Sequence, residues 1–402
     1  MISKEFKELL TQRTFFLFWL TRVIGTTSQQ ILLVVLAWQL YDLTSSAFDL
    51  GLIGLFQFIP ALLLSLPAGQ IVDRYHKGKI LFICFLFHVF VSIILFYSTT
   101  HDFFSREIVF FSATILGITR AFQMPSQQSL TPSLVPRSIL QNAIAFSSSG
   151  MHTSIIVGPA IGGFLYFLGP ANVYMICGFL FTLSTVLCLF IKYKHKKNKS
   201  LTSFSGILEG IKFVWKNKTL LGAISLDLFA VLLGGATALL PMFARDILQT
   251  GPEGLGILRA APAFGALFCA LLITQWPMKT KIGEKLFLSV FIFGISMFFF
   301  GISTNFYLSV FALVIAGASD SLSVVIRMTL IQLETPDSLR GRVSSVNAIF
   351  IGASNELGEF ESGATAAILG PVGSVVVGSL GTVLVVVAWA KKFPSLIRRD
   401  RL

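Results

Sequence analysis

Charged and amide side chains occur singly inside stretches of this 402-residue chain that are otherwise apolar. Arg22 and Gln29 stand seven residues apart, and Arg120 and Gln123 stand three apart, so each pair shares one face of a helix. Guanidinium and amide groups bind anionic or polar molecules through charge-assisted hydrogen bonds. The pattern predicts polar side chains that face a bundle interior or a wet cavity and not lipid, and the candidates for a substrate cavity are Arg22, Gln29, Arg120, Gln123, Asp227, Asp320 and Arg327.

Three carboxylates in apolar stretches are candidates for carrying protons. Asp320 shares a helix face with Arg327, and Glu356 and Glu359 stand three residues apart in the next apolar region. An acid in apolar surroundings can alternate between its charged and neutral forms as its environment changes, and proton coupling requires this property. The alternative is permanent neutralisation by an arginine, for example of Asp320 by Arg120.

The residue patterns of hydrolases and metal sites do not occur in this sequence. Its five histidines form no H-x-x-x-H or H-E-x-x-H pattern, and there is no G-x-S-x-G stretch. The four cysteines stand singly in apolar segments and are interpreted as packing residues. We therefore expect a protein that is not an enzyme and that uses no metal or cofactor.

The composition is that of a membrane protein, since 54% of the residues are hydrophobic, 12% are charged and 40 are phenylalanine. Stretches of about 20 mostly apolar residues are long enough to cross a bilayer as helices. Such stretches predict an all-α integral membrane fold with twelve transmembrane helices, at residues 15–41, 48–68, 80–98, 107–131, 143–168, 173–191, 219–244, 254–275, 286–303, 306–331, 343–369 and 373–390.

Basic residues are distributed unevenly between the two sides of the predicted membrane. Of the 31 lysines and arginines, 25 fall in the tails and in the loops on their side, whereas the opposite loops hold only Arg106 and Arg245. By the positive-inside rule, both termini and the middle loop are cytoplasmic. We expect a multi-pass protein of the bacterial inner (cytoplasmic) membrane. The net charge of +12 thus comes from basic residues in the cytoplasmic tails and loops. Nucleic-acid binding is not expected, because the sequence does not predict a soluble fold.

The two halves of the chain are copies of one unit with an offset of 200 residues. The stretch Gly158-Pro159-Ala160-Ile161-Gly162-Gly163 recurs in outline at residues 358–363. The predicted domains are a six-helix bundle at 1–191, a cytoplasmic linker at 192–218 and a second six-helix bundle at 219–402. In the linker, apolar residues recur at helical spacing, which predicts an amphipathic helix lying on the inner leaflet; they are Ile207, Ile211, Val214 and Trp215.

The short loop at residues 69–79 carries an acid followed by bases on the cytoplasmic surface. It resembles the conserved loop between helices 2 and 3 of major facilitator superfamily transporters at four positions, Gly69, Asp73, Arg74 and Lys77. His76 and Gly78 depart from the family pattern. The resemblance implies a conformational latch that joins the cytoplasmic ends of the two halves when the transporter faces outward. The alternative is a basic turn that only sets topology.

Two more stretches resemble signatures of the same superfamily. Arg120 and Gln123 match the R-x-x-Q of its helix 4, and Met124 replaces the glycine that follows. The helix-packing motif resembles the helix-5 signature of its exporters, which implies antiport and a sealed contact between helices 5 and 8. It comprises Gly158, Pro159, Gly162 and Gly163. The alternative for this motif is ordinary packing of small residues. For Arg22, the alternative is a side chain that extends to the nearby membrane surface.

Residues 41–44, 60–63, 66–69 and 356–359 resemble the subgroup that contains the enterobactin exporter and macrolide efflux proteins. The resemblance implies a transporter that exports an amphipathic siderophore or drug-like compound from the cytoplasm by proton antiport and alternating access. Three arginines in the predicted lining favour an anionic compound. The expected partners are the bilayer, the substrate and protons, without nucleic acid or an obligate protein partner. An uptake transporter of the same fold is the alternative.

Overall fold

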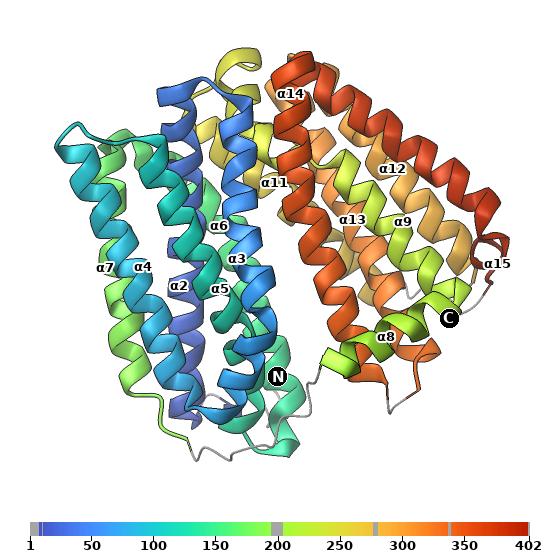
Figure 1. Ribbon diagram of the computed structural model, residues 1–402, viewed down its shortest axis with the longest axis horizontal. Helices are drawn as coiled ribbons and strands as arrows, with labels where there is room; N and C mark the ends of the chain where they lie inside the picture. Colours follow the sequence, from blue (N-terminus) through green and yellow to red (C-terminus); the bar gives the residue numbers. More distant parts are fainter. Residues whose placement is uncertain (1–7, 10, 194–203, 276–279, 337–338, 401–402) are drawn as a thin grey trace. The chain divides into compact units, whose positions relative to one another are not determined.

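The computed structural model describes residues 8–9, 11–193, 204–275, 280–336 and 339–400, and every regular element in these ranges is a helix (Figure 1). The predicted all-α fold is therefore confirmed. The chain divides into two compact units, Met1–Leu43 with Ile59–Thr202 and Thr44–Phe58 with Ser203–Leu402. The domain bounds predicted from the sequence, 1–191, 192–218 and 219–402, stay a prediction.

The N-terminal half consists of six long helices that satisfy their backbone hydrogen bonds internally, as a lipid environment requires. They are α2 (Arg13–Thr44), α3 (Ala47–Arg74), α4 (Lys77–Thr100), α5 (Arg106–Leu134), α6 (Leu140–Leu165) and α7 (Pro170–Leu189), with the 3₁₀ turns η1 (Arg137–Ile139) and η2 (Tyr166–Leu168) on either side of α6. α3 is divided between the units, because its first part, up to Phe58, groups with the second.

The C-terminal half begins with the linker helix and repeats the pattern of long apolar helices. Its elements are α8 (Phe204–Lys216), α9 (Lys218–Gly234), η3 (Thr237–Leu239), α10 (Leu240–Met242), η4 (Phe243–Ile247), α11 (Pro252–Gln275), α12 (Ile282–Ile302), α13 (Phe306–Glu334), α14 (Arg340–Lys392) and α15 (Pro394–Ile397). Gly51 in the first part of α3 lies against the backbone of Glu359 and Gly363 in α14. This contact of small residues explains why that part of α3 groups with the second unit.

Among the described residues, 11 helices are long and apolar enough to cross a membrane. The last of them, α14, has 53 residues and would be about 80 Å long, far more than the roughly 30 Å of a bilayer's hydrocarbon core. It breaks at Gly370, whose φ of 73° lies in the left-handed region, and Pro371 follows. The break separates the predicted helices 343–369 and 373–390, so α14 supplies two stretches that are each long enough to cross a membrane.

The seventh crossing, Lys218–Ile247, is a single span but not a continuous helix, in contrast to the helix predicted at 219–244. α9 ends at Gly234, and Gly235 has an extended backbone with φ of −73° and ψ of 128°. The chain then continues through the 3₁₀ turn η3, the short α10 and the π-helix η4. Two adjacent glycines lower the local helix propensity, and this explains where the helix stops.

The duplication seen in the sequence is repeated in the packing of the helices. In the first unit, a Cβ at Gly158 of α6 would lie 2.6 Å from Gln30 Cβ of α2, and one at Gly162 would lie 3.0 Å from Ile31 Cα. In the second unit, a Cβ at Gly358 of α14 would lie 3.0 Å from the Val231 carbonyl of α9. The equivalent helix in each repeat thus uses equivalent small residues to approach its neighbour closely.

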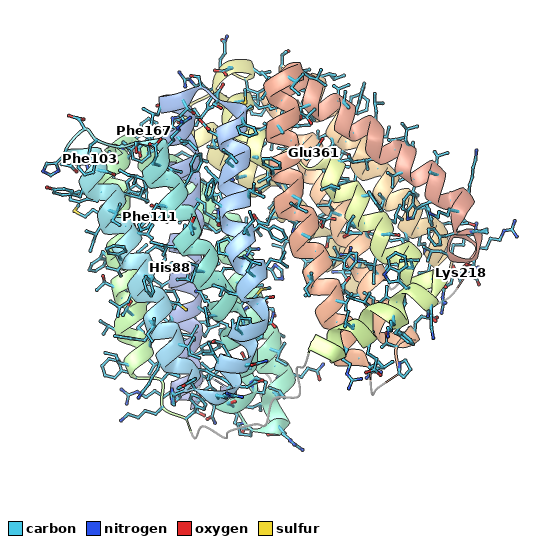
Figure 2. The ribbon with its side chains drawn as sticks, in the orientation of Figure 1. His88, Phe103, Phe111, Phe167, Lys218 and Glu361 are labelled. Atoms are coloured by element: carbon cyan, nitrogen blue, oxygen red, sulfur yellow. The ribbon has the colours of Figure 1, made fainter. Side chains whose placement is uncertain are left out.

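Large apolar side chains cover the outside of the helices. Phe103, Phe111 and Phe167 are exposed, and Figure 2 labels them on the first unit. His88 is by contrast fully buried in α4, where its Nε2 lies 2.9 Å from Thr119 Oγ1 of α5. An apolar exterior with polar groups turned inward is the arrangement that lipid requires.

The linker helix predicted from the sequence is present as α8. Val214 on its apolar face is buried in a hydrophobic cluster with residues of α9, α13 and α14, and Gly210 packs on the Arg342 backbone. Glu209 forms an ion pair with Arg342. Ile211 and Val214 of the apolar face therefore pack against protein in the second unit, and the side chain of Ile207 lies outside the described residues. Trp215, 65% exposed, is a residue of this helix that remains available to lipid.

Candidate functional site

Arg22 is held by α6 within the first unit. Its Nη1 donates a hydrogen bond of 2.7 Å to Ser147 Oγ, and its Nη2 lies 2.9 Å from Met151 Sδ. Trp19, one turn earlier on α2, stacks on Phe146 with ring centroids 4.8 Å apart. No described carboxylate forms a salt bridge with Arg22. The guanidinium is therefore fixed in position by neutral groups and keeps its capacity to attract an anion.

The predicted polar residues of α5 lie deeper in the same unit. Gln123 and Gln127 are buried, and Arg120 is partly buried and engaged with its surroundings. Gln29 of α2 is also partly buried. The suggested pairing of Arg120 with Asp320 would join the two units, and it stays a prediction.

Asp227 and Arg327 form a buried ion pair in the second unit, between α9 and α13. Only 2% of Arg327 and 5% of Asp227 are exposed, and Arg327 is the largest fully buried side chain described. Each charge has its counter-ion within the protein, so the cost of burying it in an apolar bundle is largely offset. That both residues line a substrate cavity stays a prediction.

Asp320 has surroundings different from those of Asp227. It lies two turns before Arg327 on α13, is partly buried, and forms no hydrogen bond or salt bridge with the described residues. Ser323, on the same face, is buried with its Oγ unpartnered. Among the described residues, Asp227 therefore has a counter-ion within the bundle and Asp320 forms no salt bridge.

The two predicted coupling glutamates of α14 are both engaged with their surroundings. Glu356 is 9% exposed. Glu359 lies against α3, where a Cβ at Gly54 would be 3.0 Å from its Oε2. Figure 2 shows Glu361 on the same helix, and this side chain accepts a hydrogen bond of 2.8 Å from Thr365 Oγ1.

Arg259 of α11 is a charged residue that the sequence reasoning missed. The charge of Glu359 acts on it, and its Nη1 is buried without a hydrogen-bond partner. The signal was present in the sequence, because Arg259 is the one charge between residues 254 and 275. A charge inside such a stretch faces the bundle and not lipid. Arg259 therefore belongs with the candidate site residues.

The four residues of the predicted latch lie at the junction of α3 and α4. Lys77 Nζ donates a hydrogen bond of 3.0 Å to the Ser129 carbonyl of α5, and the Lys77 backbone N–H donates one of 2.8 Å to Tyr193 Oη. Asp73 and Arg74 end α3, and a Cβ at Gly69 would meet nothing within 4 Å. The structure thus shows contacts of Lys77 inside the first unit. A latch to the other half stays a prediction.

Comparison of the sequence with known proteins identifies several relatives. Over 317 residues the chain is 25% identical to the staphyloferrin A transporter of Staphylococcus aureus, covering 77% of this chain and 79% of that protein. It is 24% identical over 364 residues to macrolide efflux protein A of Streptococcus pyogenes, covering 86% and 87%. A Na⁺, Li⁺, K⁺/H⁺ antiporter of Planococcus maritimus is 22% identical over 331 residues, covering 73% and 77%.

The fold is similar to that of solved transporters. A crystal structure of a POT family transporter in complex with 5-aminolevulinic acid superposes with a TM-score of 0.77 at 10% identity, covering 96% of each chain. At this identity the likeness concerns the fold alone. Residues 8–400 match the model of the family described as transmembrane secretion effector. The chain is thus a multi-pass membrane transporter and not an enzyme, and it belongs to the transmembrane secretion effector family of the major facilitator superfamily.

Proposed function

We propose that this protein exports a small amphipathic organic molecule, a siderophore or a drug-like compound, from the cytoplasm in exchange for protons. The family description and the macrolide efflux relative support export. The siderophore-transporter relative and the cation/H⁺ antiporter relative support the substrate class and the coupling ion. The charge asymmetry of the loops supports placement in the bacterial inner membrane with both termini in the cytoplasm.

The observation that carries proton coupling is the difference between Asp227 and Asp320. Asp227 is neutralised by Arg327, so its charge is fixed. Asp320 has no such partner among the described residues, and an isolated charge in apolar surroundings is costly. Binding and release of a proton is the remaining way for Asp320 to adapt when its access to water changes. Glu356 and Glu359 are the second candidates, because both already interact with their surroundings.

An anionic polar compound fits the charges better than a neutral lipophilic one. Arg22 is held by neutral partners in the first unit, and Arg259 has a buried Nη1 without a partner in the second. Arg120, Gln29 and Gln123 add further donors from α5 and α2. Guanidinium groups bind carboxylates and phosphates by charge-assisted hydrogen bonds. A substrate with carboxylate or catecholate groups would find such donors within each unit.

The test is made with the purified protein in proteoliposomes that contain a pH-sensitive dye. An anionic siderophore and a macrolide are added separately to wild type, to Asp320→Asn and to the control Glu361→Gln. Glu361 is a suitable control because its carboxylate accepts a local hydrogen bond from Thr365. We expect substrate-driven proton movement in wild type and in the control, and none in Asp320→Asn.

Two outcomes contradict parts of the proposal. Substrate transport without any change of internal pH would exclude proton antiport, and transport coupled to protons in all three proteins would remove Asp320 from the proton path. Direction is measured separately with vesicles of both orientations. Substrate accumulation only on the cytoplasmic side of the protein would favour the alternative, an uptake transporter of the same fold.

A further inference from the structure

A cavity of about 590 Å³ lies in the first unit, where the start of α4 meets the end of α7. It is lined by mostly apolar residues of both helices and by His76, Lys79, Lys192 and Tyr193. Its volume lies within the range of pockets that hold small organic ligands. The residues proposed to bind substrate and protons are not among those that line it.

Contacts between the two helix ends give the cavity a fixed inner wall. The Tyr193 hydroxyl accepts a hydrogen bond of 2.8 Å from the Lys77 backbone N–H. The rings of His76 and Tyr193 lie 4.4 Å apart. Burial raises the pKa of Tyr193, and the hydrogen bond from Lys77 opposes this shift, so the hydroxyl stays neutral at physiological pH and adds no negative charge. The wall therefore does not repel an anion.

The lining is apolar on the side of the helices and basic at their ends. Phe82, Ile83 and Leu189 form the apolar part, and Ile83 and Leu189 are more than half exposed. Lys79 and Lys192 are exposed at the basic end, and none of the described lining residues is acidic. A ligand that matches this surface has an anionic head and an apolar tail.

We propose that the cavity binds a phospholipid with an anionic headgroup. The phosphate lies between Lys79 and Lys192, and an acyl chain lies along Phe82, Ile83 and Leu189. Basic pockets between transmembrane helices at the cytoplasmic side bind acidic lipid headgroups. The charge distribution of the loops assigns this end of α4 and α7 to the cytoplasmic side. A soluble anion would satisfy the lysines but would leave the apolar wall uncovered.

The proposal is tested by native mass spectrometry of the full-length protein in detergent, titrated with phosphatidylglycerol or with phosphatidylcholine of the same chains. The variant Lys79→Gln/Lys192→Gln removes the basic end. The control Lys212→Gln/Lys216→Gln makes the same change of charge at exposed lysines of α8, which do not line the cavity. Each lysine near a lipid surface changes the affinity for an acidic lipid about fivefold. We therefore expect the cavity variant to bind phosphatidylglycerol roughly 30-fold more weakly than wild type, and the α8 control to bind it as wild type does.

The remaining outcomes would overturn the proposal. Equal binding of both lipids to wild type would mean that the site does not recognise the headgroup. If the α8 control lost as much affinity for phosphatidylglycerol as the cavity variant, the whole basic surface and not the cavity would attract the lipid. Glycerol 3-phosphate is added as a competitor without acyl chains, and displacement of phosphatidylglycerol at equal concentration would show a site for a soluble anion.

Discussion

At the scale of single residues, buried charge is handled in two ways within the second unit. Asp227 and Arg327 neutralise each other between α9 and α13, whereas Asp320 on the same α13 has no salt-bridge partner among the described residues. The first arrangement fixes both charges, and the second leaves Asp320 as the proposed proton carrier. The pair is therefore expected to contribute to stability, and Asp320 to coupling.

We predict that breaking the Asp227–Arg327 pair destabilises the protein more than removing both charges. Asp227→Leu or Arg327→Met leaves one buried charge without a counter-ion, which costs about 3–5 kcal/mol of unfolding free energy. The double variant Asp227→Leu/Arg327→Met leaves none and should recover most of this loss. The measurement is the thermal unfolding midpoint in detergent, evaluated as a double-mutant cycle.

A matched control for this cycle is Asp246→Asn, which breaks the exposed contact of Asp246 with Arg245, 3.9 Å apart. An exposed pair of this kind contributes less than about 1 kcal/mol, so the midpoint should change little. If the losses of the two single variants simply add in the double variant, the charges do not interact and the account of the pair is wrong.

Sequence reasoning located most of these charges but could not assign their partners. Asp227 and Arg327 were recognised as charges in apolar helices, yet they are 100 residues apart, and the rotation of α9 against α13 decides whether they meet. Arg259 was missed although its isolation in an apolar stretch was visible. Its interaction with Glu359 depends on the packing of α11 against other helices, which periodicity does not specify.

At the scale of elements, both repeats place small residues where one helix meets another. The face of α6 that carries Gly150, Ser154, Gly158 and Gly162 packs on α2, and Ser154 Oγ donates a hydrogen bond of 3.2 Å to the Val23 carbonyl. Ser362 of α14 donates in the same way to the carbonyl of Gly235, which directly follows α9. The sequence predicted the motif and, by resemblance, a contact of helix 5 with helix 8, which stays a prediction. The contact of the motif with α2 came only from the structure.

We predict opposite effects for glycine-to-alanine changes at Gly158 and Gly352. A Cβ at Gly158 meets Gln30 Cβ at 2.6 Å, so Gly158→Ala forces α6 away from α2 and should cost about 1–3 kcal/mol of unfolding free energy. A Cβ at Gly352 meets nothing within 4 Å. Gly352→Ala should therefore gain up to about 1 kcal/mol from helix propensity. Unfolding midpoints of both variants in one detergent provide the comparison, and equal shifts would contradict close packing at Gly158.

The C-terminal tail supplies contacts that its sequence did not indicate. The Lys281 backbone N–H donates to Asp400 Oδ1 at 3.1 Å, so the tail caps the start of α12. Arg399 forms an ion pair of 2.6 Å with Glu334 at the end of α13. The loop 276–283 contains bases but no acid, unlike the acid-containing loop 69–79 of the first repeat. Asp400 thus brings a carboxylate to the corresponding helix start from a distant part of the chain.

At the scale of the whole molecule, the sequence predicted the number of crossings because length and hydropathy determine it directly. Where helices break was harder to predict. The break at Gly370 coincides with a gap between two predicted helices, whereas the break at Gly234 and Gly235 lies inside a predicted one. Apolar composition continues through the second break, so a hydropathy pattern does not detect it.

The orientation and the number of crossings lead to one prediction about accessibility. In a background without the four native cysteines, His101→Cys marks the loop after α4, Lys212→Cys marks α8, and Lys392→Cys marks the end of α14, all at exposed positions. A membrane-impermeant maleimide added to intact cells should label only His101→Cys. Permeabilised cells should show labelling of all three, which serves as the control for reactivity.

Comparing the labels at positions 212 and 392 also tests whether α14 crosses the membrane once or twice. If α14 turns back at Gly370, six crossings separate the two lysines and they share a side. If α14 crossed only once, five crossings would separate them and the label would reach one of the two in intact cells. Labelling of both lysine sites, with protection of His101→Cys, would instead invert the orientation. The anionic-lipid cavity would then face the outer leaflet, and the charge asymmetry of the loops would no longer support the proposed export from the cytoplasm.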